Sequence, residues 1–165
     1  MIAAARVAGG VGGLALIAAA LVSAVRLLVM PRATRDPIVQ VVWVSIRRAL
    51  EIVLRRQSTF AARDATMSVY APLATMCLLP TWLVMTWLGF AGLFFATGAP
   101  DAPAALVESG SSLLTLGFIR PTGATHVALA FAEAMIGLIL VALLVAYLPT
   151  MYAAFGRREQ AVTLL

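Results

Sequence analysis

The sequence predicts an all-α membrane protein with three transmembrane helices and a short re-entrant helix and loop between the second and the third. Composition is the first reason, because hydrophobic residues make up 62% of the 165 residues and charged residues only 12%. A soluble domain of this size needs more polar surface than that. The second reason is that three apolar segments each reach the length of about 20 helical residues that a bilayer requires.

The apolar segments define the predicted transmembrane helices. These segments occupy residues 7–30, 68–97 and 128–147. Arg26 is the one charged residue in the first run, and Glu133 is the one charged residue in the third. The predicted transmembrane helices lie within residues 1–30, 68–97 and 127–149. A cleaved signal peptide is the alternative for the first run, but its apolar length exceeds the usual one and no clear small-x-small site follows it.

The arginines predict the orientation of the chain. Most of them lie in the segment 31–67, namely Arg32, Arg35, Arg47, Arg48, Arg55, Arg56 and Arg63. The C-terminal segment adds Arg157 and Arg158, whereas residues 98–127 contain only Arg120. Since basic loops stay in the cytoplasm, we predict that 31–67 and the C-terminus are inside and the N-terminus outside, in a multi-pass protein of the cell membrane. The net charge of +5 is then a juxtamembrane feature and does not indicate nucleic-acid binding.

The cytoplasmic segment 31–67 is an Arg-rich linker with a predicted amphipathic helix at 37–56. Apolar residues recur there at helical spacing: Val39, Val42, Trp43, Ile46, Leu50 and Val53. An arginine-rich face of this kind suits a helix that lies among anionic lipid headgroups of the inner leaflet. The predicted headgroup ligands are Arg47, Arg48, Arg55 and Arg56. A structural elbow that packs on the neighbouring helices is the alternative, and the two hypotheses are compatible.

Patterns that would indicate catalysis or metal binding are missing from the sequence. Cys77 is the single cysteine and lies in an apolar run, so neither a disulfide framework nor a thiolate metal site is expected. The chain has one His, no clustered pair of acids within a span and no Gly-rich phosphate loop. We therefore expect that it is not an enzyme and that it holds no cofactor and no metal beyond a permeant cation.

Residues 98–127 predict a short helix followed by an unusual loop. Asp101 is a suitable N-cap acid, and Pro103 suits the first turn of a helix. A helix at 103–114 follows, because Gly110 is the only breaker in that stretch. The chain then reads Thr115, Leu116, Gly117 and Phe118 before Pro121 and Gly123 turn it away. This helix is half as long as a membrane span, so it predicts a segment that enters the membrane and returns.

Non-helical backbone at membrane depth is tolerated where it lines a water-filled path or is buried in protein. Backbone carbonyls along such a path replace the hydration shell of an ion. The negative end of the helix dipole at residue 114 then faces a cation. Gly117 allows backbone conformations that direct successive carbonyls inward. The pattern therefore predicts a pore loop whose ion path runs along residues 115–118.

Residues 68 to about 160 resemble the two-helix-pore potassium channel superfamily. That family carries Thr-Val-Gly-Tyr-Gly, or near variants such as Thr-Ile-Gly-Phe-Gly, as its selectivity filter, and this chain matches at Thr115, Leu116, Gly117 and Phe118. It differs at Ile119, where the family has a second Gly, and at Arg120, where an Asp is common. The resemblance implies an outer helix at 68–97, a pore helix at 103–114, a filter at 115–118 and an inner helix at 127–149. Together these form a pore module at 68–156.

The resemblance and the residues around the loop name further candidates. Glu133 lies in the outer third of the inner helix and needs a partner, for which the candidates are Arg120, Ser111 and Ser112 behind the filter. Gly137 lies deeper in the same helix. The family uses a Gly there as a bending point for gating, whereas close helix packing is the alternative. Glu108 reads as an exposed acid and His126 as a residue at the membrane edge.

The predicted function is the pore-forming subunit of a homotetrameric, potassium-channel-like monovalent cation channel. A non-conducting scaffold, sensor or accessory subunit is the main alternative, and a transporter component is another. Ile119 is β-branched and resists the left-handed conformation that a second Gly would adopt, so the preference for potassium over sodium is expected to be weak. Residues 157–165 resemble the start of a cytoplasmic tail and predict a truncated chain.

Overall fold

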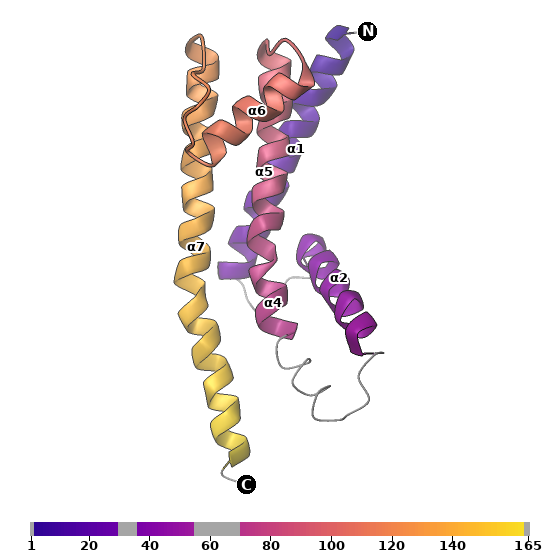
Figure 1. The fold of residues 1–165 in the computed structure, drawn as a ribbon, viewed down its shortest axis with the longest axis vertical. Helices are drawn as coiled ribbons and strands as arrows, with labels where there is room; N and C mark the ends of the chain where they lie inside the picture. The colour runs from indigo at the N-terminus through magenta and orange to yellow at the C-terminus, as the bar shows by residue number, and fades with distance from the viewer. Residues whose placement is uncertain (1, 30–35, 55–69, 164–165) are drawn as a thin grey trace.

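The computed structural model describes residues 2–29, 36–54 and 70–163, and the regular elements of these residues are all α-helices (Figure 1). In chain order they are α1 (Ile2–Val29), α2 (Pro37–Leu54), α4 (Tyr70–Met76), α5 (Leu78–Thr97), α6 (Ala102–Leu113) and α7 (Ala124–Thr163). Three stretches are long and apolar enough to cross a membrane: Ile2–Leu27, Pro72–Thr97 and Ala124–Leu143. The predicted all-α class and the three helices of membrane-spanning length are confirmed.

The second and third predicted spans show the largest differences from the sequence predictions. The second predicted helix is divided at Cys77 into α4 and α5. Pro80 explains the division, because its ring nitrogen has no hydrogen for the carbonyl four residues earlier and its ring crowds that carbonyl. The third predicted helix was expected to end at residue 149, but α7 continues to Thr163. Pro149 therefore removes one backbone hydrogen bond without ending the helix.

The helices form an elongated bundle, with the start of α1 and the end of α7 at opposite extremes (Figure 1). α1 and α5 cross along much of their length, and α7 stands beside them (Figure 1). α6 slants between α5 and α7 in the half of the bundle that holds the N-terminus (Figure 1). From the end of α6 the chain climbs back beside α7 to that helix's first residue, while α2 lies near the opposite end of α5 (Figure 1).

Glycines bring the backbones of α1 and α5 into contact. A Cβ added at Gly13 would overlap the carbonyl oxygen of Gly89, and one added at Gly92 would lie 2.5 Å from the carbonyl oxygen of Gly9. Side chains at these positions would force the helices apart, so the small residues set the distance between the two helices. We call the contact between these four glycines the glycine seam.

α2 is fixed to the other helices by a buried polar cluster at its first turn. Asp36 precedes the helix and accepts hydrogen bonds from the N–H groups of Ile38 and Val39, at 2.9 and 3.2 Å. The same oxygen accepts one from Ser23 Oγ of α1 at 3.0 Å, and Ser23 Oγ accepts one from Trp82 Nε1 of α5 at 3.1 Å. The capped end of α2 is therefore joined to both neighbouring spans.

Candidate functional site

The short helix α6 begins where the sequence predicts. Asp101 is its N-cap, with extended backbone, and its Oδ1 accepts a hydrogen bond from the N–H of Ala104 at 2.8 Å. Pro103 lies in the first turn, where its missing N–H leaves no carbonyl unpaired. The helix runs from Ala102 to Leu113, one residue earlier at both ends than predicted. Its 12 residues span about 18 Å, well short of a membrane crossing.

Residues 114–119, here called the TLGF loop, fold back onto the last turn of α6. The carbonyl oxygen of Ser111 accepts hydrogen bonds from the N–H groups of Leu116 and Gly117, at 2.9 and 3.4 Å. The hydroxyl oxygen of Ser111 accepts a third from the N–H of Ile119 at 3.2 Å. Ser112 adds its carbonyl oxygen, which lies 3.1 Å from the N–H of Thr115. Two consecutive serines of α6 thus determine the path of the loop.

The loop backbone alternates in handedness. Thr115 has a φ of 54° and Gly117 a φ of 68°, and among the described residues Thr115 is the only non-glycine with positive φ. A β-branched residue in that region is strained, and strain of this kind collects at functional sites. Alternation between right- and left-handed residues turns successive N–H groups toward one side, here toward Ser111. Ile119 stays outside the left-handed region, as its β-branched side chain predicts.

This arrangement directs a row of carbonyl groups away from α6. In a trans peptide the N–H and the C=O lie on opposite sides of the C–N bond, and no described peptide is cis. The N–H groups that bind Ser111 belong to three such peptide units. The carbonyls of those units therefore face the opposite way, and they belong to Thr115, Leu116 and Phe118. No hydrogen bond within the described residues occupies these three oxygens.

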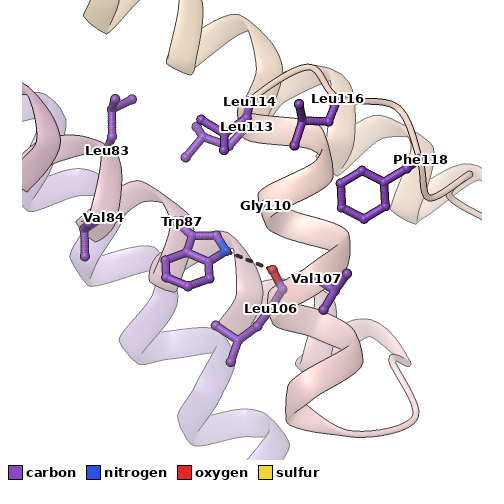
Figure 2. Close-up of a pocket in the computed structure, with 10 residues that line it drawn as sticks. All are labelled: Leu83, Val84, Trp87, Leu106, Val107, Gly110, Leu113, Leu114, Leu116 and Phe118. Carbon is purple, nitrogen blue, oxygen red and sulfur yellow. Dashed lines mark hydrogen bonds between the residues drawn. The ribbon is translucent and has the colours of Figure 1, made fainter.

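The TLGF loop separates two hollows. One, of about 490 Å³, lies between the loop and α7 and is reached by the odd-numbered residues Thr115, Gly117 and Ile119. The other, of about 420 Å³, lies between α5 and α6 and is reached by the even-numbered residues Leu114, Leu116 and Phe118 (Figure 2). Figure 2 also shows the hydrogen bond from Trp87 Nε1 to the carbonyl oxygen of Leu106, 2.8 Å long, which fixes the floor of the second hollow.

A buried polar chain holds α6 between α5 and α7. Glu133 of α7 is 0% exposed, and its Oε1 lies 2.5 Å from Ser109 Oγ. The same hydroxyl lies 2.8 Å from the carbonyl oxygen of Trp87, so a single serine connects three helices. The second carboxyl oxygen, Oε2, is buried and has no partner among the described residues. The prediction that Glu133 pairs with Arg120, Ser111 or Ser112 is therefore wrong, because the orientation of α6 about its axis turns Ser109 toward α7 instead.

A second polar group lies where α5, α6 and α7 approach one another at the end of the bundle. The side chain of Glu108 is only 12% exposed, and its Oε1 lies 2.9 Å from Nδ1 of His126. The other ring nitrogen of His126 lies 3.2 Å from Oγ1 of Thr97, the last residue of α5. The expectation of an exposed Glu108 was wrong, because α7 begins directly beside this face of α6. His126 is a connecting residue among three helices.

The other residues that the sequence singled out lie in α6, α7 and α2. A Cβ at Gly137 would lie 2.9 Å from the carbonyl oxygen of Leu113, so this glycine lets the end of α6 approach α7 closely. That contact is the packing alternative that the sequence left open. Ser112 donates from its hydroxyl to the carbonyl oxygen of Glu108 at 3.1 Å. Arg47 and Arg48 are exposed on α2, whereas Arg55 and Arg56 lie outside the described residues.

Sequence reasoning missed Ser109, which contacts Glu133 more closely than any candidate it named. A signal was present in the spacing, because Ala105, Ser109 and Leu113 recur every four positions and therefore share one side of a helix. In the structure this side of α6 is buried. In the described ranges no three His, Cys, Asp or Glu side chains come close enough to hold a metal ion. No protein-family model, no curated protein and no solved structure matches the chain.

Proposed function

We propose that the chain is the pore-forming subunit of a potassium-channel-like channel for monovalent cations in the cell membrane. In this proposal α6 is a re-entrant pore helix and the TLGF loop is the filter. The observation that carries it is the row of carbonyls of Thr115, Leu116 and Phe118, which face away from α6 and accept no hydrogen bond within the described residues. Unoccupied carbonyls directed to one side can replace the water around a cation.

The position of α6 supports the same proposal. α6 is too short to cross a membrane, it lies between two helices of membrane-spanning length, and the chain returns from its end toward the start of α7 (Figure 1). Irregular backbone at that depth needs either protein around it or a water-filled path beside it. The side chains of Leu116 and Phe118 are 59% and 64% exposed, so this chain alone does not surround the loop.

One loop cannot enclose an ion, so the proposal requires four chains around a central axis. The loops of four copies would then present their carbonyls to one path. Ile119 departs from the potassium-channel pattern, and its backbone stays outside the left-handed region that a second Gly would adopt. Under this proposal the selectivity for potassium over sodium is therefore weak. The non-conducting scaffold, sensor or accessory subunit and the transporter component are the alternatives that an ion-flux experiment separates from this proposal.

The test compares two glycine substitutions in the reconstituted full chain. Gly117 and Gly123 both have positive φ, 68° and 86°, and neither has another atom within 4 Å of an added Cβ. Gly117→Val and Gly123→Val therefore impose a similar local strain, but only the first alters the TLGF loop. We expect cation flux in planar bilayers to be lost in Gly117→Val and kept in Gly123→Val, with both proteins folded. A parental conductance in folded Gly117→Val refutes the proposed ion path.

A further inference from the structure

The helix α2 presents one face that no other described element covers. The opposite face is fixed, because Val42 lies in a buried cluster with Ala24 of α1 and with Leu78 and Trp82 of α5. Besides the cap at Asp36, the hydroxyl of Tyr70 donates to the carbonyl oxygen of α2's Trp43 at 3.1 Å. α2 therefore cannot roll about its axis to hide its outer side.

The contacts also fix the depth of α2 relative to the two spans. Ala24 lies three residues before the end of the span Ile2–Leu27, and Leu78 lies six residues after the start of the span Pro72–Thr97. Each distance corresponds to one or two helical turns, about 5 to 9 Å along the axis. α2 therefore lies beside the ends of both spans, where the hydrocarbon core of a bilayer gives way to headgroups.

The uncovered face combines apolar and basic side chains. Val41, Val44 and Ile52 are 65%, 45% and 63% exposed. Arg48 is exposed on the same side of the helix, between Val44 and Ile52, and forms no ion pair with another described residue. Next to it Arg47 Nε lies 2.9 Å from Glu51 Oε1, so part of its charge is already neutralised.

We propose that this face of α2 binds anionic lipid. Val41, Val44 and Ile52 contact the acyl chains, and Arg48, assisted by Arg47, binds the phosphate and the negative headgroup. Basic side chains with long apolar stems suit this boundary, since the stem stays in the apolar layer while the charged end reaches the headgroups. A second copy of the same face fits poorly, because the contact would bring two basic faces together. The proposal is independent of the ion path, since α2 lies at the end of the bundle away from the TLGF loop (Figure 1).

The test measures lipid binding to the purified full chain by native mass spectrometry in mild detergent, with phosphatidylglycerol and phosphatidylcholine as the two probes. We expect phosphatidylglycerol to bind more tightly than phosphatidylcholine. Arg48→Gln is expected to weaken the binding of phosphatidylglycerol about fivefold and to leave the binding of phosphatidylcholine unchanged. Arg48→Lys is expected to retain most of the affinity for phosphatidylglycerol. Arg120→Gln is the matched control, because it removes one exposed arginine from the loop at the opposite end.

Glu51→Gln gives a test of opposite sign. Removal of the carboxylate frees Arg47, so phosphatidylglycerol is expected to bind more tightly than in the parent, whereas a purely structural role of α2 predicts no gain. Circular dichroism confirms that each variant keeps its helices. The proposal is overturned if both lipids bind equally well, if Arg120→Gln loses as much affinity as Arg48→Gln, or if Glu51→Gln leaves phosphatidylglycerol binding unchanged.

Discussion

The glycine seam and the junction of α6 with α7 are two helix contacts built on different principles. At the seam Gly13 and Gly89 bring backbone against backbone, and no polar side chain takes part. At the junction a buried glutamate, Glu133, and a serine, Ser109, meet beside a strained loop. The first contact depends on shape alone, whereas the second places polar groups where desolvation makes them costly.

Under the proposed function, the difference separates a contact that holds two helices together from one that also positions the proposed ion path. Close packing of small residues is a general way to join helices in a membrane, where lipid tails are as apolar as the side chains. A buried acid within a span is costly and marks functional sites by default. The left-handed Thr115 adds strain that the hydrogen bonds to Ser111 and Ser112 offset. We therefore expect substitutions at the seam to act on folding alone and, under the proposed function, substitutions at the junction to act on both folding and ion flux.

The largest expected effect is at the seam. Gly13→Leu puts a side chain where even a Cβ overlaps the carbonyl oxygen of Gly89, so α1 and α5 must separate. We expect a loss of about 3 kcal/mol in the free energy of unfolding. Unfolding by sodium dodecyl sulfate from mild detergent, followed by circular dichroism, measures it. Gly12→Leu is the matched control, because its Cβ meets nothing within 4 Å. An equal loss in both variants would contradict the seam.

A smaller effect is expected at the junction. Ser109→Ala removes the hydroxyl that contacts both Glu133 and the carbonyl oxygen of Trp87. The carboxyl group is then left buried without a partner, at a cost of about 2 kcal/mol. The same unfolding measurement applies, with Ser112→Ala as the control, because that hydroxyl contacts only a carbonyl oxygen of its own helix. Equal stability of the two variants would mean that the buried pair contributes nothing.

The sequence predicts what depends on local pattern. The three spans follow from apolar length, and the start of α6 follows from Asp101 and Pro103, since caps act within one turn. The glycine seam also had a local signal in α1, because Gly9 and Gly13 are spaced by four, as in small-residue packing motifs. That spacing alone does not tell which helix faces it, so the partner of α1 had to come from the fold.

The partners of the buried acids could not be predicted from the sequence either, because residue spacing does not show which side of a helix faces its neighbour. Ser109, Ser111 and Ser112 lie within one turn of α6, and which of them meets Glu133 depends on the rotation of α6 against α7. Glu108 reads as exposed on an isolated helix and is covered only because α7 starts beside it with His126. Rotation and the return path of a loop are tertiary properties, which residue spacing restricts but does not determine.

The smallest effect on stability, and the sharpest test of the loop beside the junction, comes from Ile119→Gly. The N–H of Ile119 is held by Ser111 Oγ, a bond that a glycine can keep, so folding is expected to change by less than about 1 kcal/mol. A glycine can also enter the left-handed region and turn its own carbonyl into the row of Thr115, Leu116 and Phe118. Under the proposed function this adds a site for the ion and shifts the bi-ionic reversal potential toward selectivity for potassium over sodium. Ile119→Val keeps the β-branch and should retain the parental reversal potential. A shift of equal size in both variants would mean that backbone conformation at position 119 does not set the selectivity.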